Sequence, residues 1–286
     1  MDLHEFDKYR ASVATERGRI SYVDIGEGPR VAVFVHGVGT ASYLWRNVIE
    51  RLGVRYRCIA LDLPLHGHSP ARPQQAFTLA ALAGVVVDLC DALGLPPVDL
   101  VGNDTGGAVA QALATSHRER VRTLTLTDCD AHDNFPPEGF KATVELAAAG
   151  LIAPAADALL ADAAAMRSTS LSSSYENPDI VSDEVFRAYL TPVLGTFEHA
   201  REFERLLTEL DAAELLALES KLATLTIPTL VVWGTGDPLF DIKWAYWLRD
   251  TIPGAGTVVE VPGGNLFHPE ERPAELAAAL QSFWAA

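Results

Sequence analysis

One aspartate occupies a position where a side chain with a chemical role is expected. The segment Gly102–Gly107 reads GNDTGG and lies between an apolar run and a stretch with helical periodicity. A sharp strand-to-helix turn that lifts one side chain above a sheet needs small residues two positions before and after it. Gly102 and Gly106 supply them, which puts Asp104 at the apex. The alternative is a helix N-cap, because aspartate is also a favoured N-cap residue.

Three further segments favour a chemical role. His36–Gly39 (HGVG) follows an apolar run, and its backbone N–H groups could face a developing negative charge. Asp62–Ser69 reads DLPLHGHS, and Trp233–Pro238 reads WGTGDP. In this order, the four segments resemble the oxyanion loop, the D-x-P-G-x-G-x-S loop, the nucleophile turn and the acid-bearing turn of α/β-hydrolases. The resemblance covers nearly the whole chain and implies an α/β-hydrolase fold, with a mostly parallel central sheet flanked by helices and a helical cap insertion.

Two shorter stretches resemble haloalkane dehalogenases, which also carry aspartate at the nucleophile turn. They are Ser42–Ile49 (SYLWRNVI) and Ser116–Val121 (SHRERV). A carboxylate is ionised at neutral pH and needs no base in order to attack. Attack on an sp3 carbon that bears a halide or an epoxide oxygen gives an alkyl ester, whereas attack on an ester carbonyl would give an anhydride. Asp104 therefore favours halide or epoxide substrates over carboxylic esters.

The chain departs from both enzyme classes that it resembles. Haloalkane dehalogenases hold the leaving halide with a Trp after the nucleophile and often an Asn after the His-Gly pair, where this chain has Thr105 and Val38. Epoxide hydrolases usually have a proline in the His-Gly loop and two cap tyrosines that protonate the epoxide oxygen. The loop here has no proline. The candidate aromatic residues for the cavity are Tyr175, Tyr189, Tyr246 and Trp244.

The general base is the weakest match. The family places histidine directly after the glycines that follow the last strand, where this chain has Asn265. His268 is the nearest histidine and is the predicted base, with Asn265 facing the pocket as the alternative and His132 in reserve. Either of two acids could orient the imidazole by accepting its second N–H group. Asp237 in the Trp-Gly turn is preferred, and Asp128 at the end of an earlier strand is the alternative.

These residues together predict a hydrolase whose substrate is a small organic halide or epoxide. Its reaction would pass through an alkyl-enzyme ester on Asp104. The N–H groups of Val38 and Thr105 would hold the oxyanion in a loop that His36 supports. A non-hydrolytic cyclase or lyase, or a small-molecule-binding protein with a degenerate triad, is the alternative. No nucleotide-binding motif or metal-ligand spacing is present, so we expect no cofactor and no metal.

The elements that must position these residues follow from hydrophobic periodicity. Apolar runs predict strands at 31–35, 57–61, 98–101, 121–127, 227–233 and 257–261, and helical spacing predicts helices at 79–93 and 273–284. Strands that alternate with helices indicate a parallel sheet. From about 140 to 222 the chain is rich in alanine and leucine and has helical periodicity. We therefore predict a core in two parts, 1–133 and 223–286, with a helical cap at 134–222.

Composition limits the partners. The chain has 286 residues, 49% of them hydrophobic, and a net charge of −16. This acidic excess argues against nucleic acid and anionic membranes. No apolar stretch approaches the ~20 residues that span a bilayer, and the first residues do not form a signal peptide. Cys58, Cys90 and Cys129 read as reduced core cysteines of a cytoplasmic protein. We expect a small-molecule substrate and leave open a homodimer.

Overall fold

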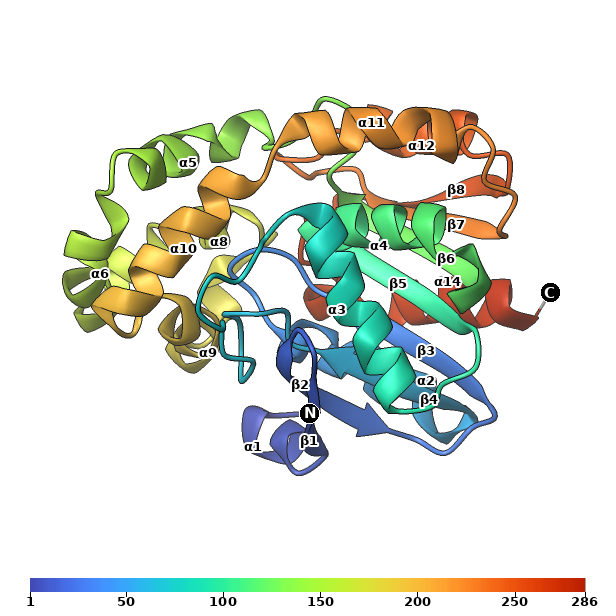
Figure 1. The fold of residues 1–286 in the computed structure, drawn as a ribbon, viewed down its shortest axis with the longest axis horizontal. Coiled ribbons are helices and arrows are strands. Elements are labelled where there is room, and N and C mark those ends of the chain that lie inside the picture. The colour runs from blue at the N-terminus through green and yellow to red at the C-terminus, as the bar shows by residue number, and fades with distance from the viewer. Residues whose placement is uncertain (286) are drawn as a thin grey trace.

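A mixed eight-stranded sheet runs through the centre of the computed structural model, which describes residues 1–285 (Figure 1). β2 is antiparallel to both of its neighbours, and every other adjacent pair is parallel. The order is β1-β2-β4-β3-β5-β6-β7-β8. The strands are β1 (Arg10–Thr15), β2 (Gly18–Ile25), β3 (Arg30–Val35), β4 (Tyr56–Leu61), β5 (Val98–Asp104), β6 (Val121–Cys129), β7 (Thr229–Gly234) and β8 (Ala255–Val261). The mostly parallel sheet confirms the predicted fold class.

The apolar runs of the sequence form the central strands. β3, β5, β6 and β7 are buried along almost their whole length, because helices cover both faces of a parallel sheet. β1 and β2 were not predicted. β1 is largely exposed and its sequence, RASVAT, contains no continuous apolar run, so it forms as the outer strand of a hairpin with β2. The three cysteines are buried and free, two of them within the sheet.

Helices cover the two faces of the sheet in pairs. In Figure 1, α3 (Leu79–Ala92) and α4 (Thr105–Ser116) pack together in front of the strands, and α2 (Arg46–Leu52) and α14 (Pro273–Ala285) pack together behind them. The predicted helix at 79–93 ends at Gly94, whose φ of 60° and N–H bond to Asp91 close the last turn. The other core helices are α1 (Leu3–Asp7), α12 (Lys243–Thr251) and α13 (His268–Glu271).

The segment between β6 and β7 is helical wherever it has regular structure in the described chain. Its α-helices are α5 (Lys141–Ala148), α6 (Ile152–Ala161), α7 (Ala163–Arg167), α8 (Ser170–Ser173), α9 (Asp183–Leu194), α10 (Phe197–Glu209) and α11 (Ala212–Leu222). α10 contacts α5, α6 and α9, and this group lies at the left of Figure 1, whereas α11 packs on α4 of the core. Within residues 1–285, no single helix is long and apolar enough to cross a membrane, although one bent pair, Glu138–Ala148 with Ile152–Ala161, passes by length and composition.

A buried glutamate ties this helical segment to the core. Glu270 of α13 accepts hydrogen bonds from the hydroxyl groups of Tyr175 (2.9 Å) and Tyr189 (3.0 Å) and pairs with Arg46 of α2 at 2.5 Å. Arg46 also stacks on the ring of Tyr43. All of these groups are buried. One carboxylate therefore joins the two parts of the molecule.

Removing that carboxylate should cost stability. In Glu270→Gln, the guanidinium of Arg46 stays buried without its counter-charge, and we expect a loss of about 3 kcal/mol in the free energy of unfolding. Urea denaturation measures this loss. Glu275→Gln removes the exposed partner of Arg272 and should cost less than about 1 kcal/mol. Equal losses in the two variants would contradict the role given to Glu270.

Candidate active site

Asp104 sits at a strained turn between β5 and α4. Its φ of 56° and ψ of −136° lie outside the regions that non-glycine residues normally occupy. The flanking glycines are required by close backbone contacts. A Cβ atom at Gly106 would lie 2.3 Å from the carbonyl oxygen of Val35, and one at Gly102 would lie 2.5 Å from that of Gly106. The spacing of small residues in the sequence therefore has the physical cause that we expected.

The carboxyl group of Asp104 faces the predicted oxyanion loop. A Cβ atom at Gly37 would lie 2.1 Å from Oδ2 of Asp104, so only glycine fits at that position. Burial raises the pKa of Asp104 to about 7, and the charge of Asp237 adds to the rise. Hydrogen bonds from the backbone N–H groups of Thr105 and Val38 oppose it by stabilising the ionised form. The N–H groups of the two predicted oxyanion donors thus favour a negative charge on the Asp104 carboxyl group.

Two buried histidines fix the oxyanion loop in place. The ring of His36 accepts the N–H of Leu63 through Nε2 at 2.9 Å, and the ring of His66 accepts the N–H of Gly39 at 3.1 Å. Burial lowers the pKa of His36, and it lowers the pKa of His66 to about 3. Both rings are therefore neutral at pH 7. They act as hydrogen-bond acceptors that shape the backbone.

His268 is buried beside Asp128 and follows Phe267, a residue of the cavity wall, directly in sequence. Its Nε2 atom lies 2.8 Å from Oδ2 of Asp128 and 2.7 Å from Oγ1 of Thr127, whereas its Nδ1 atom has no hydrogen-bond partner within the described chain. Burial lowers the pKa of His268 to about 4, which keeps the imidazole neutral. Leu266 and Phe267 line the cavity, but His268 does not. In residues 1–285, no hydrogen bond joins His268 to Asp104.

The acid beside His268 is Asp128, so our preference for Asp237 is corrected. Oδ1 of Asp237 instead accepts the N–H groups of Leu239 (2.7 Å) and Phe240 (3.1 Å), and its side chain also hydrogen-bonds Asp128. Burial raises the pKa of both carboxyl groups well above their usual range. The chain folds this way because Asp128 ends β6 and its carboxylate accepts the N–H of Gly234 in the neighbouring strand β7. Asp128 and Asp237 both lie near the ends of neighbouring strands, and the sequence alone does not show which of them contacts the imidazole.

The remaining candidates lie elsewhere. The amide of Asn265 donates to the carbonyl of Tyr175 at 3.0 Å and forms no hydrogen bond with Asp104 in the part of the chain that is described. His132 stacks on Trp247 and lies 3.5 Å from Glu219, so it is no base for Asp104. The four aromatic candidates are also absent from the cavity wall: Tyr175 and Tyr189 bind Glu270, Tyr246 binds Glu260, and Trp244 packs against His132.

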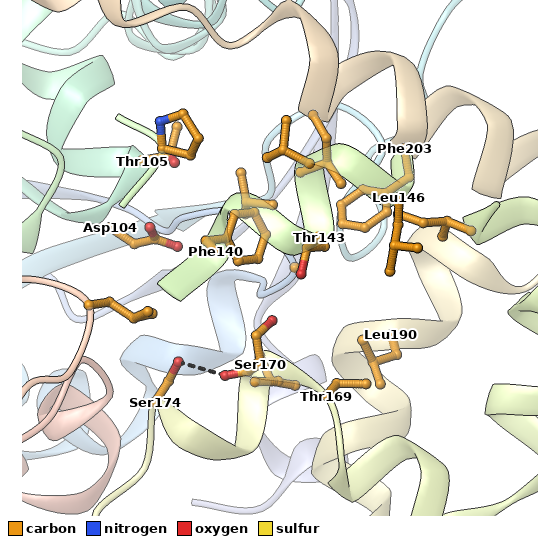
Figure 2. Close-up of a pocket in the computed structure, with 18 of the residues that line it drawn as sticks. Asp104, Thr105, Phe140, Thr143, Leu146, Thr169, Ser170, Ser174, Leu190 and Phe203 are labelled. Carbon is orange, nitrogen blue, oxygen red and sulfur yellow. Dashed lines mark hydrogen bonds between the residues drawn. The ribbon is translucent and has the colours of Figure 1, made fainter. Parts of the chain in front are cut away.

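Asp104 opens into an apolar cavity of about 360 Å³ between the core and the helical segment. Figure 2 shows Asp104 and Thr105 on one side and Phe203, Leu146 and Leu190 on the other. Further wall residues include Val38, Phe135, Phe140, Ile152, Leu159, Leu171, Leu194, Leu207, Leu239, Leu266 and Phe267. Such a wall suits a small, mostly apolar molecule.

The second carboxyl group of this wall was not identified from the sequence. Asp130 follows β6, is 1% exposed and lines the same cavity as Asp104. Its Oδ2 atom accepts a hydrogen bond from Oγ1 of Thr105 at 2.9 Å, and its Oδ1 atom has no partner in the described structure. The signal was the position of Asp130 directly after β6, because the carboxyl ends of neighbouring parallel strands lie at the same edge of a sheet and Asp104 ends the adjacent strand β5. Within residues 1–285, no cluster of three potential ligands could hold a metal ion.

Comparison with known proteins assigns the family. Residues 31–272 match the family described as the alpha/beta hydrolase fold. The chain belongs to this family. It is 29% identical over 266 residues to the magnesium-chelatase 30 kDa subunit of Rhodobacter capsulatus, a match that covers 91% of this chain and 90% of that protein. It is 28% identical over 267 residues to haloalkane dehalogenase 2 of Mycobacterium tuberculosis, covering 93% and 91%. The structure of the epoxide hydrolase CorEH is similar with a TM-score of 0.78 and 25% identity, covering 96% and 98%.

These relatives bear different names, so the family alone does not determine the reaction. The similarity to a dehalogenase and to an epoxide hydrolase supports a hydrolase. The geometry of this α/β-hydrolase adds two features that the family match does not specify: a carboxyl group at the nucleophile turn, and no imidazole among the described residues of the cavity wall.

The raised pKa of Asp104 should appear in the stability of the protein. The pKa of an unfolded aspartate is about 3.9. Between that value and about 7, the folded state keeps a proton on Asp104 that the unfolded state has lost. The stability that this proton contributes is complete at low pH and is lost as the pH rises towards 7. The side chain in Asp104→Asn cannot ionise. We therefore compare the free energy of unfolding of this variant with that of wild type at each pH. The difference should favour the variant by at least about 1 kcal/mol more at pH 8 than at pH 5.

Urea denaturation of both proteins at the two pH values measures the difference. Comparing two pH values cancels the constant effect of exchanging a carboxyl group for an amide. The exposed Asp250→Asn provides a control, which should show the same difference from wild type at pH 5 and pH 8. A pH-independent effect of Asp104→Asn would mean that Asp104 does not carry a raised pKa.

Proposed function

We propose that this α/β-hydrolase acts on a small apolar epoxide or organic halide and forms an alkyl ester on Asp104. The observation that carries this proposal is the position of the Asp104 carboxyl group, at the strained turn, open to an apolar cavity and bonded by the N–H groups of Val38 and Thr105. One carboxylate oxygen is oriented by these donors while the other attacks. After attack, the same donors stabilise the oxyanion that forms when water adds to the ester.

The surroundings of Asp104 favour epoxides over halides. A departing halide ion needs donors, but Val38 has an apolar side chain and the Thr105 hydroxyl is bonded to Asp130. The other wall residues are mostly apolar. Epoxide opening is assisted by ring strain and needs a proton on the oxygen instead of a pocket for an anion. The similarity to the epoxide hydrolase CorEH is consistent with this preference.

A second candidate function is a catalyst or binding protein that does not hydrolyse the ester. The position of His268 favours it, because the only hydrogen bonds of its imidazole in residues 1–285 are to Asp128 and Thr127 and the ring does not line the cavity. An imidazole held there does not activate a water molecule beside Asp104. Under this alternative, the protein accumulates an ester on Asp104 or binds its ligand without reaction.

A single-turnover experiment separates these functions. Excess protein is mixed with 1,2-epoxyhexane in water enriched in oxygen-18, and both diol and protein are analysed by mass spectrometry. Hydrolysis through an ester places the heavy oxygen in Asp104 and leaves the first diol unlabelled, because water attacks the carboxyl carbon. A permanent adduct on Asp104 would identify the non-hydrolytic alternative. A labelled diol with unlabelled protein would exclude the ester.

Asp104→Ala is the matched negative control and should form neither adduct nor diol. Without the carboxylate, we expect activity to fall by at least about a thousandfold, to the level of uncatalysed epoxide opening. Asp104→Asn needs a mass check for deamidation back to aspartate. Circular dichroism should show that both variants keep the fold, because neither substitution adds volume at the turn.

Substrate preference provides a further test. Since positions 38 and 105 beside Asp104 offer no free side-chain donor to a leaving halide, 1,2-epoxyhexane should be opened at least about a hundredfold faster than chloride is released from 1-chlorobutane. Diol analysis and a chloride electrode measure the two rates under the same conditions. Rapid release of chloride would show that another part of the cavity stabilises the halide.

A further inference from the structure

Asp130 is a second carboxyl group in the cavity that the Asp104 mechanism does not use. Oδ2 of Asp130 accepts a hydrogen bond from the hydroxyl of Thr105, the residue next to Asp104. The main-chain oxygen of Asp130 accepts a hydrogen bond from Nε2 of Gln111 at 2.8 Å. Oδ1 is buried and has no hydrogen-bond partner within residues 1–285. A buried carboxyl oxygen without a partner is costly in a folded protein, unless a proton or a ligand occupies it.

The tyrosine hydroxyl groups of the helical segment and the hydroxyl of Thr105 are already engaged, and the serine and threonine hydroxyl groups elsewhere on the wall are much weaker acids than a carboxyl group. The hydroxyl groups of Tyr175 and Tyr189 donate to Glu270, and that of Thr105 donates to Asp130. In the described structure, the cavity wall contains no histidine, lysine, arginine or tyrosine. Asp104 and Asp130 are the titratable residues of this wall.

The two carboxyl groups hold a proton between them at neutral pH. Burial raises the pKa of Asp130 well above its usual range, and the charge of Asp104 raises it further. Two carboxylates that share an apolar site cannot both be ionised without a large cost, so one remains protonated. Because the N–H groups of Val38 and Thr105 favour the ionised form of Asp104, the state in which Asp104 is ionised keeps the proton on Asp130.

We propose that Asp130 is the acid that protonates the opening epoxide and then the base that activates water for hydrolysis of the Asp104 ester. This role rests on the ester mechanism proposed above. The proposal gives Asp130, which follows β6, the proton transfers that the sequence analysis predicted for His268. The reaction class is the opening of an apolar epoxide to a diol.

The proton balance closes over one cycle. In the first step, an oxygen of Asp104 bonds to the epoxide carbon, the carbon–oxygen bond of the ring breaks, and the released oxygen takes the proton of Asp130. In the second step, the Asp130 carboxylate takes a proton from water as the hydroxide adds to the ester carbon. The tetrahedral intermediate then expels the alkoxide, which receives that proton and leaves as the diol. The product state has one proton on Asp104, and its transfer to Asp130 restores the starting state.

The test compares two electrophiles of equal length in Asp130→Asn. Opening of 1,2-epoxyhexane needs a proton on its leaving oxygen, whereas bromide leaves 1-bromohexane as an anion. Formation of the Asp104 adduct from the epoxide should slow by at least about a hundredfold, while adduct formation from the bromide should be at least as fast as in wild type. Any adduct that forms should persist. Intact-mass spectrometry with peptide mapping follows both reactions.

Asp133→Asn is the matched control, because Asp133 is an exposed aspartate three residues further along. It should leave both rates unchanged. If Asp130 only stabilises the turn, Asp130→Asn slows both electrophiles equally, which overturns the proposal. The proposal is also overturned if the adduct persists in His268→Gln while Asp130→Asn hydrolyses it normally. That result would show that His268 activates the water. A different result would contradict the ester mechanism itself. In that case, neither probe gives an adduct on Asp104 in wild type or in any variant, and heavy water does not label Asp104.

Wild-type protein gives an independent test if Asp130→Asn fails to fold or the bromide does not react. Adduct formation from the epoxide should have a bell-shaped pH profile, since it needs an ionised Asp104 and a protonated Asp130. A profile that only rises with pH overturns the role of Asp130. Where 1-bromohexane does react, its profile should only rise, because that reaction needs the carboxylate alone.

Discussion

The site depends on the burial of one carboxyl group at a turn that the backbone adopts only under constraint. Asp104 has a positive φ angle, which costs of the order of 1–3 kcal/mol for a residue with a side chain. The turn persists because β5 pairs with strands on both sides and α4 packs directly on it. Gly102, Gly106 and Gly37 are the residues that let these segments approach. The packing of the core therefore determines where the reactive oxygen lies.

Burial of acids without cations imposes a second constraint. Asp237 raises the pKa of Asp104, Asp104 raises that of Asp130, and Asp128 raises that of Asp237. The described cavity wall contains no lysine or arginine. The negative charge of these carboxyl groups must then be removed by protonation, because no ion pair in the described structure neutralises it. Near β7, Asp128 and Asp237 share a hydrogen bond beside the neutral ring of His268. Near the cavity, the charge of Asp104 raises the pKa of Asp130, which favours a proton on one of these two carboxyl groups.

Local signals in the sequence predicted the central elements well and the long-range contacts poorly. Buried runs such as Val31–Val35 form strands because a parallel sheet requires apolar residues on both faces. The glycine spacing around Asp104 was informative because the turn cannot form without it. In contrast, the contacts of His268 depend on how β6, β7 and the loop after β8 meet, and no local pattern encodes that. The hairpin of β1 and β2 was missed because β1 is largely exposed and polar residues interrupt the apolar residues of β2, so neither strand has a continuous apolar run.

The same comparison explains why Asp130 was missed although it is next to the predicted alternatives. In the sequence, acids were candidates for orienting an imidazole, and both Asp237, which was preferred, and Asp128 met that criterion. Asp130 differs from Asp128 by two positions, and its neighbours are Thr105 and the cavity instead of His268. A family that usually moves protons with a histidine after β8 has here an amide, Asn265, at that position. In the proposed mechanism, proton transfer at Asp104 then requires another group on the cavity wall, and Asp130 after β6 is the group that we propose for it.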